Sequence, residues 1–149
     1  MIDFMQVAKD EAVLAMNKGE IPVGAIIVKD GLIIGKAHNL KENLKDITAH
    51  AEILAIRAAS KYIGDWRLNG CEMYVTLEPC SMCASAIVQS RISKLYIGTF
   101  NNDMGACGSV INILDNRRLS SFVDIKWLYD KECSELLMNF FDNRRKKEL

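Results

Sequence analysis

The chain has 149 residues, of which half are hydrophobic and 26% are charged, and its formal net charge is zero. This length and composition are typical of a single soluble domain, which we expect to span residues 1–149. The balanced charge gives no support for a generic nucleic-acid binder, because such proteins are usually basic. A membrane span and a signal peptide are also not expected, since no stretch approaches roughly 18 apolar residues and the start, "MIDFMQVAKDEAV", lacks an apolar segment.

The first part of the chain predicts a helix, a hairpin and a second helix. Asp3 is a suitable N-cap for a helix that Gly19 ends. "VGAIIV" (23–28) and "LIIGKA" (32–37) predict two strands, and Asp30-Gly31 between them predicts a primed hairpin turn. Both strands are almost wholly apolar, so we expect both to be buried on two faces. "AHAEILAIRAAS" (49–60) then predicts a helix of good helix formers.

The second part alternates strands and helices. Strands are predicted at 71–77, 94–98 and 122–128, and helices at 81–90 and 131–147. A helix between successive strands implies crossover connections and parallel pairing, with the antiparallel hairpin at one side. The predicted fold class is therefore α/β: a three-layer α/β/α sandwich around a mixed five-stranded sheet.

Five cysteines are unevenly spaced along the chain, and two of them form the segment "PCSMC". An odd number of cysteines without an export signal favours reduced thiols and a cytoplasmic protein. Cys80 and Cys83 follow a predicted strand and open a helix, where free N–H groups and the helix dipole favour thiolates. Thiolates are zinc ligands, but this pair could equally be a redox pair or half of a structural zinc site.

His50 and Glu52 lie at the start of the other central helix. Residues two apart point to opposite sides of a helix, so the two side chains converge only if His50 lies in the first turn and the site wraps around the helix end. His50, Cys80 and Cys83 would then supply three zinc ligands and leave a fourth position for water. Glu52 beside the metal could move a proton from that water to a substrate nitrogen.

Other interpretations of these residues remain open at this point. A closed structural zinc site would need a fourth ligand, and it would leave Glu52 without a role. The C-x-x-C could also be redox-active beside an incidental histidine. His38 is expected to be a hydrogen-bonded residue near a strand end, and the remaining cysteines are expected to be small core residues. The residues that could complete a closed zinc site are His38, Cys71, Cys107 and Cys133.

The linked pattern H-x-E and P-C-x-x-C is the signature of zinc-dependent base deaminases. Here it is His50-Ala51-Glu52 with Pro79-Cys80-Ser81-Met82-Cys83. Nearly the whole chain resembles the bacterial tRNA-specific adenosine deaminases, the TadA family of the cytidine-deaminase-like fold. The segments that carry the resemblance are "EIPVGAIIV", "TAHAEILAIRAA", "MYVTLEPCSMCASAIVQSRI", "GACGSV" and "ECSELLMNFFDNRR".

The resemblance implies hydrolytic deamination of adenosine to inosine at the wobble position of a tRNA anticodon, by a homodimer with one Zn²⁺ per subunit. In that reaction a zinc-activated water attacks C6 of adenine, and Glu52 is the proton shuttle. His50, Cys80 and Cys83 would hold the zinc. The resemblance further implies that the anticodon stem-loop is bound near the last helix. The substrate-binding residues that it implies are Asn39, Ala51, Pro22, Val23, Phe141 and Arg145.

Two of these assignments have simpler alternatives. An Asn amide can pair with an adenine edge, but Asn39 could also be a turn-forming residue at a strand end. Periodicity alone would place Phe141 in the core, and the basic run at the end of the chain could be a solvated helix terminus.

The chain departs from the family pattern at three places. Ile47 stands where the family commonly has proline, and Ser85 stands where it often has glycine. Asn101, Asn102 and Asp103 replace an acidic residue and a lysine, which bears on RNA contacts more than on the chemistry. The alternative function is a zinc-dependent deaminase of a free base or nucleoside such as cytosine, cytidine or guanine, which would share every catalytic residue. A catalytically silent zinc module that binds nucleic acid is a third possibility, and it would not need Glu52.

Overall fold

A computed structural model describes residues 1–148, so that Leu149, the end of the predicted domain, lies outside it. Its main feature is a five-stranded sheet in the order β2-β1-β3-β4-β7. The strand β1 pairs antiparallel with both β2 and β3, whereas β3, β4 and β7 run parallel. The strands are β1 (Gly24–Lys29), β2 (Leu32–His38), β3 (Glu72–Leu77), β4 (Lys94–Thr99) and β7 (Asp124–Trp127).

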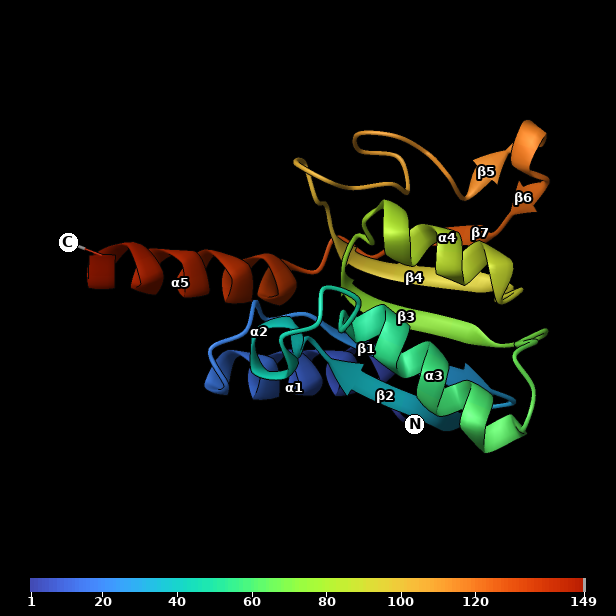
Figure 1. The fold of residues 1–149 in the computed structure, drawn as a ribbon, viewed down its shortest axis with the longest axis horizontal. Coiled ribbons are helices and arrows are strands. Elements are labelled where there is room, and N and C mark those ends of the chain that lie inside the picture. Colours follow the sequence, from blue (N-terminus) through green and yellow to red (C-terminus); the bar gives the residue numbers. More distant parts are fainter. Residues whose placement is uncertain (149) are drawn as a thin grey trace.

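Two helices cover each face of this sheet (Figure 1). The helices α3 (Ala51–Ile63) and α4 (Ser81–Gln89) lie on one face. The helices α1 (Phe4–Asn17) and α5 (Lys131–Glu148) lie on the other, and α5 extends past the edge of the body (Figure 1). This arrangement is the predicted three-layer α/β/α sandwich with a mixed sheet.

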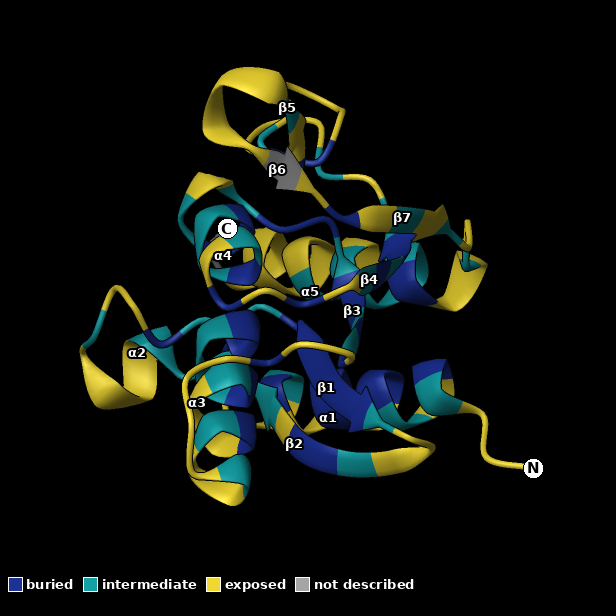
Figure 2. Ribbon diagram, turned by 90° about the vertical axis from the view of Figure 1, so that its right-hand side faces the viewer, coloured by how far each residue is buried: buried dark blue, intermediate teal, exposed yellow. Residues whose placement is uncertain are grey.

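Each face of the sheet has its own apolar core, because side chains alternate along a strand. Ala25 and Ile27 of β1 pack with α3 and α4, whereas Ile26 and Val28 pack with α1 and α5. All of β1 except its last residue, Lys29, is therefore dark blue in Figure 2. Burial on both faces was predicted for this strand and is confirmed.

The hairpin between β1 and β2 differs from the prediction in one respect. Its turn is of the primed type, with φ of 49° at Asp30 and 76° at Gly31. The prediction that β2 is buried on both faces is wrong, because β2 is the edge strand and Leu32 is 54% exposed. Apolar composition alone could not distinguish a central strand from an edge strand that α3 covers on one side.

Some short elements were not predicted. The helix α2 (Lys41–Leu44) lies between the predicted strand at 32–37 and the predicted helix at 49–60, where no element was predicted. A two-stranded ribbon of β5 (Asp115–Asn116) and β6 (Ser121–Phe122), with the 3-10 helix η1 (Arg117–Leu119), precedes β7. Phe122 therefore belongs to this ribbon and not to β7, which begins at Asp124. Among the residues that the structure describes, no helix has the length and apolarity needed to cross a membrane.

A partly buried ion pair joins α1 to Asp130, the residue before α5. Lys9 Nζ lies 2.9 Å from Asp130 Oδ2, and Lys9 is buried. Burial alone would raise the pKa of Asp130, but the hydrogen bond and the charge of Lys9 lower it below its usual value. Asp130 Oδ1 also accepts a hydrogen bond of 2.9 Å from the backbone N–H of Glu132, in the first turn of α5.

We expect Asp130→Ala to lower the free energy of unfolding by about 2–4 kcal/mol, because it removes a charged hydrogen bond and a helix cap together. Because the folded pKa of Asp130 is depressed, this contribution is present above about pH 4 and disappears as the pH falls through the folded pKa. Urea unfolding at neutral pH and at about pH 3 measures both effects. Asp124→Ala is the control, because Asp124 is exposed and lies 3.9 Å from Lys94, and a change above about 1 kcal/mol is not expected there.

Candidate active site

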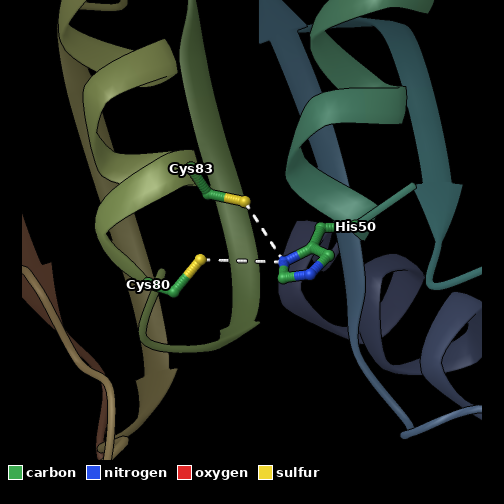
Figure 3. Close-up of side chains that lie close together, drawn as sticks. All are labelled: His50, Cys80 and Cys83. Atoms are coloured by element: carbon green, nitrogen blue, oxygen red, sulfur yellow. Dashed lines mark hydrogen bonds between the residues drawn. The ribbon is translucent and has the colours of Figure 1, made fainter. Parts of the chain in front are cut away.

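His50, Cys80 and Cys83 come together where α3 and α4 begin (Figure 3). His50 and Cys80 occupy the N-cap positions of α3 and α4, and Cys83 lies one turn into α4. The Nδ1 atom of His50 lies 3.7 Å from Sγ of Cys80 and 3.5 Å from Sγ of Cys83. The predicted position of His50 at the helix end is therefore the observed one.

The spacing of these three ligand atoms fits zinc. With Zn–S of about 2.3 Å and Zn–N of about 2.0–2.1 Å, tetrahedral coordination places a nitrogen and a sulfur about 3.6 Å apart. Both observed distances lie within 0.1 Å of that value. All three ligand atoms lie within 4.8 Å of one another, and among the described residues this is the group suited to a metal ion. One His and two Cys would leave the fourth position for water.

Hydrogen bonds within the cluster shift the pKa values of all three side chains. The hydrogen bond from Cys83, together with His50, lowers the pKa of Cys80 to about 4. That same bond and burial raise the pKa of Cys83. The hydrogen bond with Cys80 raises the pKa of His50. A metal ion bound here would replace the protons that these side chains share, because zinc is bound by thiolates and by neutral imidazole.

Glu52 lies in the first turn of α3, next to the ligands, and is only 4% exposed. Burial raises the pKa of Glu52 to about 7, and the nearby Cys80 thiolate adds to this effect. A carboxyl group whose pKa is near neutrality can both accept and donate a proton. The carboxyl group also lines the adjoining cavity, so it is open to a substrate there.

That cavity has a volume of about 270 Å³. Its floor includes His50, Glu52 and Cys80, and its sides are formed by two segments far apart in sequence. One side comes from the region of α2, and the other comes from the loop that follows β4. The residues at these two sides include Lys41, Glu42, Ile47, Asn101 and Met104, and Arg144 of α5 also lines the cavity.

Asn39 lines this cavity and also holds three chain segments together. Its Oδ1 accepts a hydrogen bond of 2.9 Å from Ala51 N–H, and its Nδ2 donates one of 3.1 Å to the carbonyl of Ile21. One amide hydrogen and one oxygen lone pair are left for a substrate. Ala51, which was also predicted to bind substrate, is fully buried, and its N–H is the donor to Asn39.

Of the other predicted substrate-binding residues, some line the cavity and others do not. Val23 lines the cavity, whereas its neighbour Pro22 is buried. Phe141 on α5 is 41% exposed, so its side chain does not belong to the core. Arg145 pairs with Asp142, and the arginine at the cavity is its neighbour Arg144. Helical geometry explains this difference, since successive residues point about 100° apart.

The alternatives to a three-ligand site are not supported by the geometry. His38 is hydrogen-bonded through Nδ1 to Glu11 at 3.2 Å and through Nε2 to Lys18 at 3.1 Å, as expected for a partnered residue at a strand end. All five cysteines are free thiols, so Cys80 and Cys83 do not form a disulfide. The other three cysteines are buried and lie outside the ligand group.

The three departures from the family pattern have different positions. Ile47 is an exposed residue at the cavity mouth, whereas Ser85 is half-buried within α4. Asn101 lines the cavity, and its Oδ1 accepts hydrogen bonds from the N–H groups of Asp103 and Met104. This bond pattern is an Asx turn, which asparagine favours, and it shapes the loop after β4.

Sequence reasoning did not identify Glu20, Glu78, Lys41, Met104 or Arg144 as cavity residues. Glu20 and Glu78 lie in the segments "EIPVGAIIV" and "MYVTLEPCSMCASAIVQSRI", which carry the family resemblance, and both are fully buried acids. A usable signal was available for Glu78, since it directly follows a buried strand and precedes a metal ligand.

Residues 1–99 match the family model for the cytidine and deoxycytidylate deaminase zinc-binding region. Together with the ligand geometry, this match assigns the fold and the His-Cys-Cys centre to the class of zinc-dependent deaminases. The tRNA-specific adenosine deaminase of Aquifex aeolicus is 53% identical over 144 residues, covering 95% of this chain and 94% of that protein. The tRNA-specific adenosine deaminase of Bacillus subtilis is 43% identical over 146 residues, covering 97% and 91%. The chain therefore belongs to the family of tRNA-specific adenosine deaminases.

Solved structures agree with this assignment. A structure from a study of A-to-I editing by tRNA:A34 deaminases at the wobble position has a TM-score of 0.87 and 41% identity, covering 90% of this chain and 98% of that one. A guanine deaminase from Bacillus subtilis has a TM-score of 0.63 and 32% identity, covering 80% and 90%. The similarity to the free-base deaminase is thus lower in both structure and sequence.

Proposed function

We propose that this protein is a zinc-dependent hydrolase that deaminates adenosine to inosine at the wobble position of a tRNA anticodon. The observation that carries this proposal is near-full-length similarity, at 39–53% identity, to proteins that act as tRNA-specific adenosine deaminases. The reaction consumes one water and releases one ammonia, with the purine C6 exchanging its amine for oxygen.

His50, Cys80 and Cys83 would hold the zinc through Nδ1 and two Sγ atoms. When bound, zinc supplies a water molecule whose pKa is lowered to about 7. The Glu52 carboxylate takes a proton from water and delivers it to N1 of the purine, which makes C6 more electrophilic. Glu52 then moves a second proton to the departing amine. Because burial raises the pKa of Glu52 to about 7, its carboxyl group can act both as the proton acceptor and as the proton donor.

The walls of the cavity are suited to position the base. Asn39 keeps one donor and one acceptor for the edge of the purine, and the apolar side chains of Val23 and Leu77 would face the ring. The fixed backbone around Asn39, including Ile21, Pro22 and Ala51, would keep the base over Glu52. These contacts orient the substrate, which is a large contribution to catalysis in its own right.

The end of α5 is proposed to contact the anticodon stem-loop through its exposed aromatic and basic side chains, including Phe141 and Arg145. Arg144 lines the cavity itself, and its guanidinium lies 5.7 Å from the ring centre of Phe140 on the same helix.

We expect Arg144→Gln to weaken stem-loop binding by roughly tenfold and to reduce the slope of log Kd against log salt by about 1, as expected for the loss of one phosphate contact. Arg145→Gln, one residue further along the same exposed surface, is the matched variant and should have a smaller effect. Fluorescence anisotropy titrations at several salt concentrations measure both quantities. Equal effects of the two variants would show that the position of Arg144 at the cavity does not matter for RNA.

A homodimer in the cytoplasm is part of the same proposal. Apolar side chains are exposed on the loop and ribbon between β4 and β7, which is consistent with a covered surface in a dimer. These side chains are Val110, Ile111, Leu119 and Phe122. Light scattering after size-exclusion chromatography tests the oligomeric state, and a monomeric mass at micromolar concentration would contradict it.

The function is tested with the purified protein on an anticodon stem-loop that carries a wobble adenosine, read by mass spectrometry. Free adenosine, cytidine, cytosine and guanine are assayed in parallel. Inosine in the stem-loop, with little turnover of the small substrates, is the expected result. Turnover of a free base with an unchanged stem-loop would keep the zinc chemistry and overturn the substrate.

A further inference from the structure

Two fully buried carboxylates, Glu20 and Glu78, lie beside the cavity, and the proposed chemistry uses neither. Each is only 1% exposed. A buried carboxylate is costly unless its oxygens are hydrogen-bonded, so the partners of these two groups indicate what they do. In both cases the donors belong to a loop that forms one side of the cavity mouth.

Glu78 holds the loop that follows β4. Its Oε1 accepts a hydrogen bond of 3.1 Å from Asn101 N–H and another from the Ser109 hydroxyl. Its Oε2 accepts hydrogen bonds of 3.0 Å and 3.1 Å from the N–H groups of Cys107 and Ser109. Four donors from one nine-residue loop therefore converge on a single carboxylate. The same loop carries Asn101 and Met104, which line the cavity at its mouth.

Backbone hydrogen bonds also hold the segment around Glu78, which directly follows β3. Glu78 N–H donates to the carbonyl of Thr99, and Ala106 N–H donates to the carbonyl of Pro79, both at 2.9 Å. Gly105 packs directly on the carboxylate, since a β-carbon there would lie 2.5 Å from Glu78 Oε2. The loop thus has little room to move as long as Glu78 remains an acceptor.

Glu20 holds the opposite side in the same way. Its Oε1 accepts a hydrogen bond of 3.0 Å from Glu42 N–H, and its Oε2 accepts bonds of 2.7 Å and 2.6 Å from the backbone and side-chain N–H groups of Asn43. Burial alone would raise the pKa of Glu20, but these hydrogen bonds lower it below its usual value. Leu40, at the N-cap position of α2, offers no side-chain cap, so Glu20 supplies that cap from a distant segment.

The loop that Glu20 holds and the loop that Glu78 holds lie at the cavity mouth, and this position decides which part of a substrate they can contact. The base must reach Glu52 and the metal ligands at the floor, between Lys41 and Ile47 on one side and Asn101 and Met104 on the other. A nucleotide that is part of a polynucleotide keeps its sugar, its phosphates and its neighbours outside, against these loops. A free base or nucleoside would leave most of that surface unused.

We propose that Glu20 and Glu78 are positioning residues that fix the two sides of the cavity mouth at the spacing that an unstacked nucleotide of an RNA chain requires. This inference rests on the proposed function. The two carboxylates would set the affinity for the polynucleotide, while the floor carries out the chemistry. Glutamine in either position has the same shape, but its NH₂ group would face N–H donors and break at least one of the bonds.

The test uses Glu78→Gln and Glu20→Gln in the zinc-loaded enzyme. In Glu78→Gln, amide hydrogen exchange is expected to accelerate roughly ten- to hundredfold at residues 101–109, because a lost buried hydrogen bond changes the population of open states by that order. Exchange at residues 41–46 should change only in Glu20→Gln. For each variant we expect KM for the stem-loop to rise roughly tenfold, kcat to change less than about threefold, and zinc to remain at about one per chain.

Glu72→Gln is the control, since Glu72 is half-buried and lies at the start of β3, at the opposite end of the strand from Glu78, which directly follows β3. Ser109→Ala is a milder variant should Glu78→Gln fail to fold, because it removes one of the four hydrogen bonds and leaves the carboxylate in place. It should shift exchange in 101–109 and KM in the same direction as Glu78→Gln, by a smaller factor.

Unchanged exchange at the held loop would overturn the inference, and so would a fall in kcat at constant KM, which would place the carboxylate in the chemistry. Failure of the wild-type enzyme on the stem-loop would instead overturn the proposed function. In that case the exchange experiment still decides whether the carboxylates hold the loops, and anisotropy with the same stem-loop decides whether they affect RNA affinity.

Discussion

Glu52→Gln is expected to lower kcat on the stem-loop by about 10²–10⁴-fold, which is the usual contribution of a positioned proton donor and acceptor. The amide matches the carboxyl group in shape, so the buried site in the first turn of α3 should keep its packing. The three metal ligands are unchanged, and zinc should remain bound at about one ion per chain. Single-turnover rates and metal analysis of the same preparation measure both expectations.

Glu42→Gln is the matched control for this variant, because Glu42 lines the same cavity but is exposed. Its kcat is expected to stay within about threefold of the wild-type value, since it is at the mouth and away from the floor. Conversion that persists in the zinc-loaded Glu52→Gln protein would refute the proton-transfer role. It would also reopen the alternative that this site is a binding module without catalysis.

Cys83→Ala should abolish zinc binding, because two ligands cannot hold the ion with the affinity of three. Metal content is expected to fall from about one per chain to a small fraction, and deamination should be lost with it. The melting temperature should also fall, since a ligand that binds only the folded state stabilises that state. A strong chelator should reproduce this fall in the wild-type protein and have little effect on the variant.

Cys71→Ala is the control that distinguishes the effect of losing the metal ion from the effect of losing a buried thiol. Cys71 is as fully buried as Cys83 but lies in the apolar core, outside the ligand group. Its replacement should cost about 1 kcal/mol of stability through a small cavity and leave the zinc content unchanged. Zinc retained at full occupancy in Cys83→Ala would mean that the ion is held elsewhere, and the assignment of the ligands would be wrong.

The metal centre could be predicted from sequence because the residues next to its ligands already indicate where the two helices begin. Cys80 follows a strong strand and a proline, and His50 precedes an unambiguous helix, so both are assigned to helix starts without tertiary information. The turn at Asp30-Gly31 was likewise fixed by local backbone preference. The sandwich followed from the alternation of strands and helices.

The remaining features depend on contacts between distant segments. Whether β2 is an edge or a central strand is decided by its partner, and its apolar composition is compatible with either. Arg144 and Arg145 are neighbours of identical chemistry, and only the angular position of α5 brings Arg144 to the cavity. The role of Glu78 requires knowledge that a loop 23 to 31 residues further on folds back over it.

His50 and Cys80 are separated by thirty residues along the chain and lie at the starts of two different helices, α3 and α4. A bound ion would therefore be a cross-link that closes a ring containing α3, β3 and the connection between them. Because the ion binds only the folded state, its binding free energy becomes available only once α3, β3 and the start of α4 have come together, so these elements are stabilised as one unit. The ion would thus influence the folding of a segment that extends to the far end of β3, well away from the atoms it activates.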